Sequence, residues 1–224
     1  CSHGDCASRH QWIRTIRESS AGVAPVGILA DLQGPKFRIG SFPEGMIEVK
    51  AGQSITVGQG AGAVIQVPGL EIFQAMSSGD RVLLGDGEVE IKLGAKTGTV
   101  FDCRVQTGGK IKSKQGVTLV GRSFDVPALS EKDIEDAIEA AKAGVDFIAL
   151  SYVRQPSDLR ELRRLIDKYD PEIRICAKIE TREALKNIDD IIKVTDLVMV
   201  ARGDLGLQVD LEDVPIAQKH IIRK

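Results

Sequence analysis

The sequence predicts an α/β protein in which a small antiparallel β domain interrupts a series of strand–helix units, and two observations indicate it. From residue 125 onward, short apolar runs alternate with amphipathic stretches, as in a parallel sheet that helices cover on both faces. Between residues 36 and 125, where 16 of the 23 glycines lie, runs of alternating polarity are separated by Gly-rich turns. The repeated strand–helix units fit either a (β/α)8 barrel or an open doubly wound sheet.

The strand–helix elements follow from hydrophobic periodicity and from local start and stop signals. The clearest helix has Ser130 as its N-cap, Asp133 three residues on, and Gly144 just past its last turn. We expect helices over 5–20 and near 131–143, 157–168, 183–193 and 211–222, and strands over 26–31, 145–151, 173–179 and 197–201.

The β domain is expected between the strand that begins at residue 26 and the helix that begins near residue 131. Gly-containing turns between alternating runs predict hairpins at Gly85–Gly87 and at Gly108–Gly109.

Composition excludes several classes of function. The formal net charge of −2 leaves no basic surface for nucleic acid or for acidic lipid. No apolar run is long enough to cross a membrane and no signal peptide is recognisable, so we expect a cytoplasmic protein. The four cysteines lack C-x-x-C spacing, which favours reduced packing thiols over a zinc site or disulfides. The three histidines also lack ligand spacing, and His10 is interpreted as a surface residue on a helix.

Charged residues follow the predicted parallel strands where those strands end. Glu180 and Asp204 occupy equivalent points of consecutive strand–helix units, so neighbouring parallel strands would bring their carboxylates together. Two convergent carboxylates suit a hard divalent cation, Mg²⁺ or Mn²⁺. The alternative, equally compatible with the spacing, is a structural ion pair of Glu180 with Lys178 or Arg202.

Two further segments could bind anions. Gly203 permits a tight turn whose amides would receive a carboxylate or a phosphate. Asp31, Lys36 and Arg38 could surround a polyphosphate, although the segment taken alone is better explained as a linker with solvated charges that turns sharply into the β domain.

Six motifs occur in the order and approximate spacing of one known family. They are SHG at the start, DLQGPKFRIG, LSEKDIEDA, VDFIALSYVR, AKIET and MVARGDLG. On these motifs, which span essentially the whole chain, the sequence resembles the pyruvate kinases. The resemblance implies a partial (β/α)8 TIM-type barrel formed by residues 1–34 and 126–224. A small antiparallel β-barrel domain, residues 35–125, would be inserted as the family's mobile lid.

The resemblance also implies an activity and its participants. The activity is transfer of a phosphoryl group from phosphoenolpyruvate to ADP, which gives pyruvate and ATP in the last step of glycolysis. The reaction would use Mg²⁺ or Mn²⁺, and the complete protein would be a homotetramer. Glu180 and Asp204 would be the metal ligands. Lys178 would stabilise the transferring phosphoryl group and the developing enolate, and Arg38 would contact phosphate oxygens.

Other roles carried over by resemblance concern binding. Residues 201–204 would hold the substrate carboxylate through their amides, and Ser151 would line the same site. The nucleotide would lie near His3 and Lys114. The residues that would bind the substrate are Ala201, Arg202, Gly203, Asp204 and Ser151. The residues that would form the monovalent-cation pocket are Ser2 and Asp31.

The chain departs from potassium-dependent relatives at two positions. Those relatives place a glutamate after Gly-Pro and a threonine after the strand-ending aspartate, where this chain has Lys36 and Leu32. An ammonium can occupy roughly the place of a bound cation, so we expect Lys36 to replace potassium. The alternative is that Lys36 points into solvent.

The resemblance places the chain inside a longer protein, from the end of the second barrel strand to the sixth helix. We therefore expect an internal fragment that is inactive alone. Two rival interpretations are a lyase or aldolase of the phosphoenolpyruvate-binding barrel class and a non-enzymatic module. The inserted Gly-rich β domain argues against the lyase.

Overall fold

The computed structural model describes residues 1, 4–122 and 126–224. The chain divides into two compact units, each described by itself. The first contains Cys1–Pro35, Pro127–Leu205 and Glu212–Lys224, and the second contains Lys36–Val126 and Gly206–Leu211.

The first unit is built on a four-stranded, wholly parallel sheet in the order β1-β10-β11-β12. Its strands are β1 (Leu29–Asp31), β10 (Phe147–Leu150), β11 (Arg174–Ile179) and β12 (Leu197–Val200). The register pairs Asp31 with Ala149, and Lys178 with Met199. Because all four strands run the same way, their carboxyl ends meet at one edge of the sheet.

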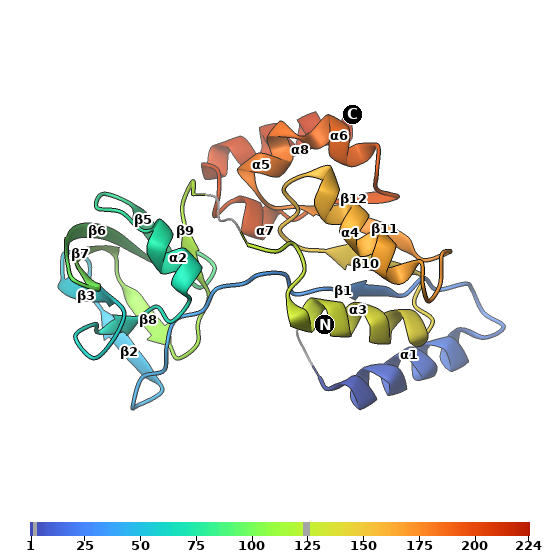
Figure 1. Ribbon diagram of the computed structural model, residues 1–224, viewed down its shortest axis with the longest axis horizontal. Coiled ribbons are helices and arrows are strands. Elements are labelled where there is room, and N and C mark those ends of the chain that lie inside the picture. Colours follow the sequence, from blue (N-terminus) through green and yellow to red (C-terminus); the bar gives the residue numbers. More distant parts are fainter. Residues whose placement is uncertain (2–3, 123–125) are drawn as a thin grey trace. The chain divides into compact units, whose positions relative to one another are not determined.

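Helices follow the strands of this sheet in the order that the periodicity predicts (Figure 1). They are α1 (Cys6–Ser20), α3 (Glu131–Lys142), α4 (Pro156–Ile166), α5 (Arg182–Lys186), α6 (Ile188–Ile192), α7 (Arg202–Leu205) and α8 (Val214–Ile222), with a 3-10 turn at Leu211–Asp213. The predicted capping box of α3 is confirmed. The Ser130 hydroxyl accepts from the Asp133 N–H, and the Asp133 carboxylate accepts from the Ser130 N–H, each at 3.1 Å.

The two faces of the parallel sheet differ. Side chains such as Ile148, Ile175 and Ile179 point to the face that packs against the helices and are fully buried. On the opposite face Leu29 and Met199 remain 37% exposed. Lys178 shares that second face because it pairs with Met199 in register. The charged residues at the strand ends therefore belong to the face that these helices leave open.

The prediction of one helix near 183–193 was wrong. Helices α5 and α6 are separated at Asn187, which has a φ of −100° and a ψ of 12°. The Asn187 side-chain amide donates to the Arg154 carbonyl at 2.8 Å. A side chain that competes for backbone partners in this way favours a break over a continuous helix.

The second unit is a β structure with two sheets. A six-stranded sheet has the order β4-β3-β7-β6-β5-β9, and β2 pairs with β8 separately. The bounds are β2 (Met46–Val49), β3 (Ser54–Gly58), β4 (Ile65–Gln66), α2 (Leu70–Ala75), β5 (Arg81–Leu84), β6 (Val89–Thr97), β7 (Val100–Thr107), β8 (Gly109–Lys112) and β9 (Val117–Leu119). Strands β3 and β4 pair in parallel, and the other pairs in this unit are antiparallel. Among the described strands β4 and β9 form the edges of the larger sheet, so a closed barrel stays a prediction.

One of the two predicted hairpins is present. Strands β5 and β6 pair across the turn that contains Gly85–Gly87. The hairpin at Gly108–Gly109 was wrong, because β8 leaves β7 and pairs with β2 in the second sheet. A Cβ on Gly108 would lie 2.6 Å from the Val49 carbonyl oxygen. Gly108 is thus needed for a close backbone approach at a change of sheet.

In the described part of the chain no helix is long and apolar enough to cross a membrane.

Candidate functional site

Lys178 lies at the centre of a polar cluster at the carboxyl end of the parallel sheet. Its ammonium nitrogen is 3.1 Å from an Asp31 carboxylate oxygen, 2.8 Å from Ser151 Oγ and 3.1 Å from Glu180 Oε1. Ser151 Oγ in turn donates to the Leu32 carbonyl at 2.8 Å. The ion pair between Glu180 and Lys178 that the sequence left open is therefore present. Three neighbouring strands, β1, β10 and β11, contribute to the cluster.

Glu180 is fully buried at this edge. Its Oε2 accepts the Tyr152 backbone N–H at 2.7 Å. Its Oε1 forms an ion pair with the Lys178 ammonium at 3.1 Å and has no other hydrogen-bond partner among the described residues. A buried carboxylate oxygen without a hydrogen bond costs free energy unless a cation or another donor meets it.

Strained backbone places the donor to Glu180. Tyr152 has a φ of +55°, which is uncommon for a bulky residue. Gly34, with a φ of +70°, packs directly against it, since a Cβ at Gly34 would lie 2.9 Å from the Tyr152 ring and 3.0 Å from Ser151 Cβ. The Gly34 N–H is held by the Asp133 carboxylate at 3.1 Å. Left-handed residues of this kind gather at functional sites, where the surrounding structure enforces them.

The charges in this cluster act on each other's pKa values. Burial raises the pKa of Glu180, the Lys178 charge and the Tyr152 N–H oppose that rise, and the Asp204 carboxylate adds to it. Burial works against the charge on Lys178, but Glu180 and Asp31 outweigh it and raise the pKa of Lys178. The influence of Asp204 on Glu180 shows that the two predicted metal ligands belong to one electrostatic site.

Asp204 sits on α7, which follows β12 after a single residue. The Leu205 N–H bonds the Ala201 carbonyl at 2.9 Å, so the turn over 201–205 is a closed helical turn. A Cβ at Gly203 would meet no atom within 4 Å, so the space around Gly203 is open. Arg202 begins this turn. The predicted substrate residues 201–204 are therefore contiguous and beside Glu180 in the same unit.

The predicted phosphate contacts belong to the other unit. Arg38 forms an antiparallel bridge with Gly116, and its guanidinium donates to the Lys114 carbonyl at 3.0 Å. Lys114 has a φ of +59°. A Cβ at Gly116 would lie 3.1 Å from the Lys36 side chain, so Lys36 also lies beside this β-bridge. Ser2 and His3 lie outside the described residues.

The structure brings together two residues to which the sequence analysis assigned no function, Cys6 and His10. All four cysteines are free, and the predicted packing role is confirmed for Cys103 and Cys176, which are buried. Burial raises the pKa of Cys176 to about 11. Cys6 and His10, in contrast, lie close to Glu139, and the ligand atoms of the three side chains are near enough to hold one metal ion. Their spacing of four residues on one helix was the available signal, but Glu139 comes from a distant segment.

Comparison with known proteins places the chain in a family. The family model described as "Pyruvate kinase, barrel domain" matches residues 1–224. The chain belongs to the pyruvate kinase family. It is 40% identical to "Pyruvate kinase" of Corynebacterium glutamicum in an alignment of 227 positions that covers 99% of this chain and 48% of that protein. It is 39% identical to "Pyruvate kinase" of Clostridium perfringens in an alignment of 234 positions that covers 100% of this chain and 48% of that protein.

A third relative is similar to this chain to the same extent. "Pyruvate kinase 2" of Synechocystis is 40% identical over 231 residues, 99% of this chain and 39% of that protein. The chain thus spans about half the length, or less, of these curated relatives.

Replacing Lys178 by methionine tests the charge coupling in this cluster. Burial already raises the pKa of Glu180 in the folded protein. The contribution of Glu180 to the free energy of unfolding is therefore largest below the ordinary pKa of a glutamate, where the carboxyl is protonated. That contribution is lost as the pH rises through the raised pKa. Without the Lys178 charge, the pKa of Glu180 should rise further. We expect Lys178→Met to lower the free energy of unfolding by about 3 kcal/mol at pH 7 and by clearly less at pH 5.

Chemical denaturation at pH 5, 6 and 7 measures this difference. Lys193→Met is the matched control, because the Lys193 side chain is 70% exposed and pairs only with Asp190 on the surface. A deficit for Lys178→Met that does not change with pH would contradict the coupling.

Proposed function

We propose that the protein carrying this chain transfers a phosphoryl group from phosphoenolpyruvate to ADP and so produces pyruvate and ATP. The observation that supports this most is the fully buried Glu180 carboxylate, with one oxygen lacking a hydrogen bond, beside Lys178 and Asp204. A site with that arrangement binds a cation and organises negative charge, and phosphoryl transfer needs little more than positioning and neutralisation of charge. Family membership supports the same reaction.

The donor set fits a hard divalent ion, Mg²⁺ or Mn²⁺. Glu180 Oε1 is buried, anionic and without a hydrogen bond, and Asp204 would add a second carboxylate from the next strand–helix unit. When bound, the ion supplies Lewis acidity to oxygens of the substrate. The Tyr152 N–H holds Glu180 Oε2, which leaves Oε1 to face the ion.

Lys178 would provide the positive charge next to the reacting group. Its ammonium is fixed by three oxygen-bearing side chains, so little conformational freedom remains to be lost when substrate binds. Its raised pKa keeps it protonated at neutral pH. In this proposal Lys178 stabilises charge on the transferring phosphoryl group and on the developing enolate.

Other residues would bind the two substrates. The amides of 201–204 would receive the carboxylate of phosphoenolpyruvate, and Ser151 would line the same site while it orients Lys178. Arg38, Lys114 and His3 would serve the nucleotide, with Arg38 on its phosphates. Residues 35–125 would act as a lid that excludes water during transfer.

The metal assignment predicts the effect of two substitutions. In the protein that carries this chain, Glu180→Gln and Asp204→Asn should each lower Mg²⁺-dependent turnover by about a hundredfold or more, because each removes one charge from the ion's site. Turnover is measured as ATP formed from phosphoenolpyruvate and ADP over a range of Mg²⁺ concentrations, beside thermal melts. Asp190→Asn, at a 66% exposed side chain, is the control. Wild-type metal dependence in either variant, or carbon–carbon cleavage in place of ATP formation, would refute the proposal.

We further propose that this activity does not require potassium. Lys36 stands where potassium-dependent relatives have a glutamate, and Leu32 stands where they have a threonine that would bind the ion, so both positions change together. The ammonium of Lys36 would take over the charge of the ion. The ion's oxygen ligand at residue 32 is then unnecessary.

Assays in buffer free of sodium and potassium test this proposal, with tetramethylammonium added to keep the ionic strength. Wild-type turnover should change less than about twofold on addition of potassium, because the positive charge is already present. Lys36→Glu should lose activity without potassium and regain it when potassium is added. A strong rise of wild-type activity with potassium would show that Lys36 does not replace the ion.

A further inference from the structure

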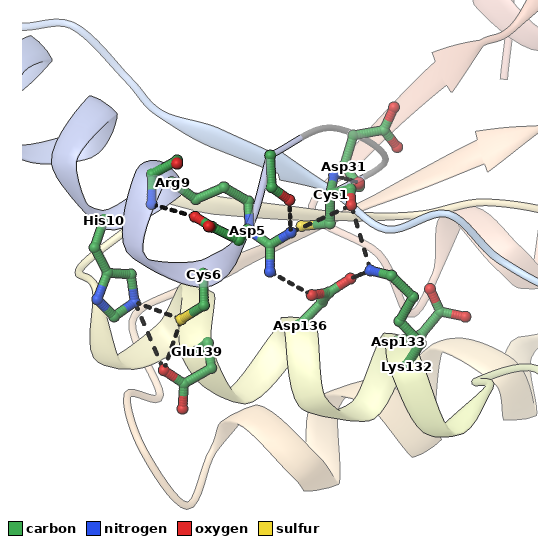
Figure 2. A network of polar contacts seen from close by, with 12 residues as sticks. Cys1, Asp5, Cys6, Arg9, His10, Asp31, Lys132, Asp133, Asp136 and Glu139 are labelled. Carbon is green, nitrogen blue, oxygen red and sulfur yellow. Dashed lines mark hydrogen bonds and ion pairs between the residues drawn. The ribbon is translucent and has the colours of Figure 1, made fainter.

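A second cluster of potential metal ligands lies between α1 and α3, within the first unit. Figure 2 shows His10 and Glu139 pointing toward the Cys6 sulfur. The Cys6 thiol donates to Glu139 Oε2 at 3.4 Å, and His10 Nε2 lies 3.8 Å from the sulfur and 3.7 Å from the same carboxylate oxygen. One sulfur, one nitrogen and one oxygen therefore face a common point.

The spacing of these atoms matches that of ligands around one tetrahedral ion. Zinc bonds of about 2.0 to 2.3 Å at tetrahedral angles separate neighbouring ligand atoms by about 3.3 to 3.6 Å. The observed separations of 3.4, 3.7 and 3.8 Å are close to those values. An ion could be bound with ligand shifts of a few tenths of an ångström. The three atoms would occupy three corners, and the fourth would remain open to water.

The helices pre-arrange two of the three ligands. Cys6 and His10 are four residues apart on α1 and so project from the same face of the helix. Glu139 comes from α3, and the two helices are tied together by an Arg9–Asp136 ion pair of 2.6 Å. The Asp5 carboxylate caps the start of α1 by accepting the Ser8 N–H at 2.8 Å, which fixes the turn that carries Cys6.

The carboxylate is oriented from its other side. Lys142 lies 3.0 Å from Glu139 Oε1, the oxygen that does not face Cys6 and His10. An outer partner of this kind holds a ligating carboxylate in place while Oε2 stays available. The side chains of His10 and Glu139 are 39% and 35% exposed, so an ion can reach them from solvent.

The chemistry of the donors selects the ion. A thiolate and an imidazole are poor ligands for Mg²⁺ but suit Zn²⁺ and similar transition metals. One thiolate and one carboxylate together cancel the charge of a divalent ion. The site therefore differs in kind from the all-oxygen site of Glu180 and Asp204.

We propose that Cys6, His10 and Glu139 form a zinc site that fastens α1 to α3. Helix α1 contains no fully buried residue, so few apolar contacts hold it in place. A metal bridging two helices would suppress local opening of the less secured one. The site would have a structural effect that is independent of the reaction at the parallel sheet.

Cobalt substitution tests the ligand set directly. The protein that carries this chain is stripped of metal and titrated with Co²⁺ and, in separate samples, with Zn²⁺ against a chromophoric chelator. We expect one Co²⁺ per chain to give the visible absorption of a tetrahedral centre and a near-ultraviolet thiolate charge-transfer band, whereas Co²⁺ at the all-oxygen site of Glu180 and Asp204 would give neither. Cys6→Ser should lose that band, and Cys6→Ser, His10→Asn and Glu139→Gln should each weaken zinc binding by about tenfold or more. Hydrogen exchange of the α1 amides should slow on addition of zinc in the wild type alone.

Cys1→Ser is the matched control, since Cys1 is another partly exposed thiol of the same unit. It should leave the cobalt spectrum and zinc affinity unchanged. Absence of stoichiometric binding, an octahedral spectrum without the thiolate band, or loss of that band in Cys1→Ser would overturn the proposal. Thermal melts of the metal-free variants identify any that fail to fold. If one of the three ligand variants fails to fold, the zinc affinities of the other two decide.

Discussion

The burial of the Glu180 carboxylate is the constraint on which the rest of the site depends. A charge with no exposure must be compensated locally, and two groups do so directly. The Tyr152 N–H meets one oxygen at 2.7 Å, the Lys178 ammonium stands 3.1 Å from the other, and Asp31 and Ser151 hold that ammonium in turn. Beyond that ion pair, Oε1 has no further hydrogen-bond partner among the described residues. Oε1 is therefore the oxygen that we propose to face a metal ion.

That arrangement includes a residue with an uncommon backbone conformation, which its neighbours hold in place. Tyr152 presents its N–H to Glu180 with a positive φ, and Gly34 lies so close to its ring that no Cβ could be accommodated without movement. Asp133 connects this contact to the start of α3, since its carboxylate accepts from both Gly34 and Ser130. The capping box of a helix and the geometry of the site are therefore one network. Such strain is retained where a packed structure enforces it.

Local patterns predicted much of the fold and part of the site. Strand ends could be located because charges follow apolar runs, and the start of α3 because Ser130 and Asp133 form a recognisable cap. The failures concern partners distant in sequence. Nothing local to Gly108 indicates that β8 will pair with β2, and the break at Asn187 depends on the Arg154 carbonyl. Likewise, Cys6 and Glu139 are 133 positions apart, so only the folded chain reveals their proximity.

A crystal structure of the protein with Mn²⁺ and pyruvate tests the central claim most directly, because manganese is located by its anomalous scattering. The account predicts a manganese peak about 2.0 to 2.2 Å from Glu180 Oε1 and from an Asp204 carboxylate oxygen. Lys178 should remain beside Asp31 and Ser151. A manganese ion bound elsewhere, with Glu180 Oε1 still facing only the Lys178 ammonium, would contradict the claim that this buried oxygen exists to bind a metal.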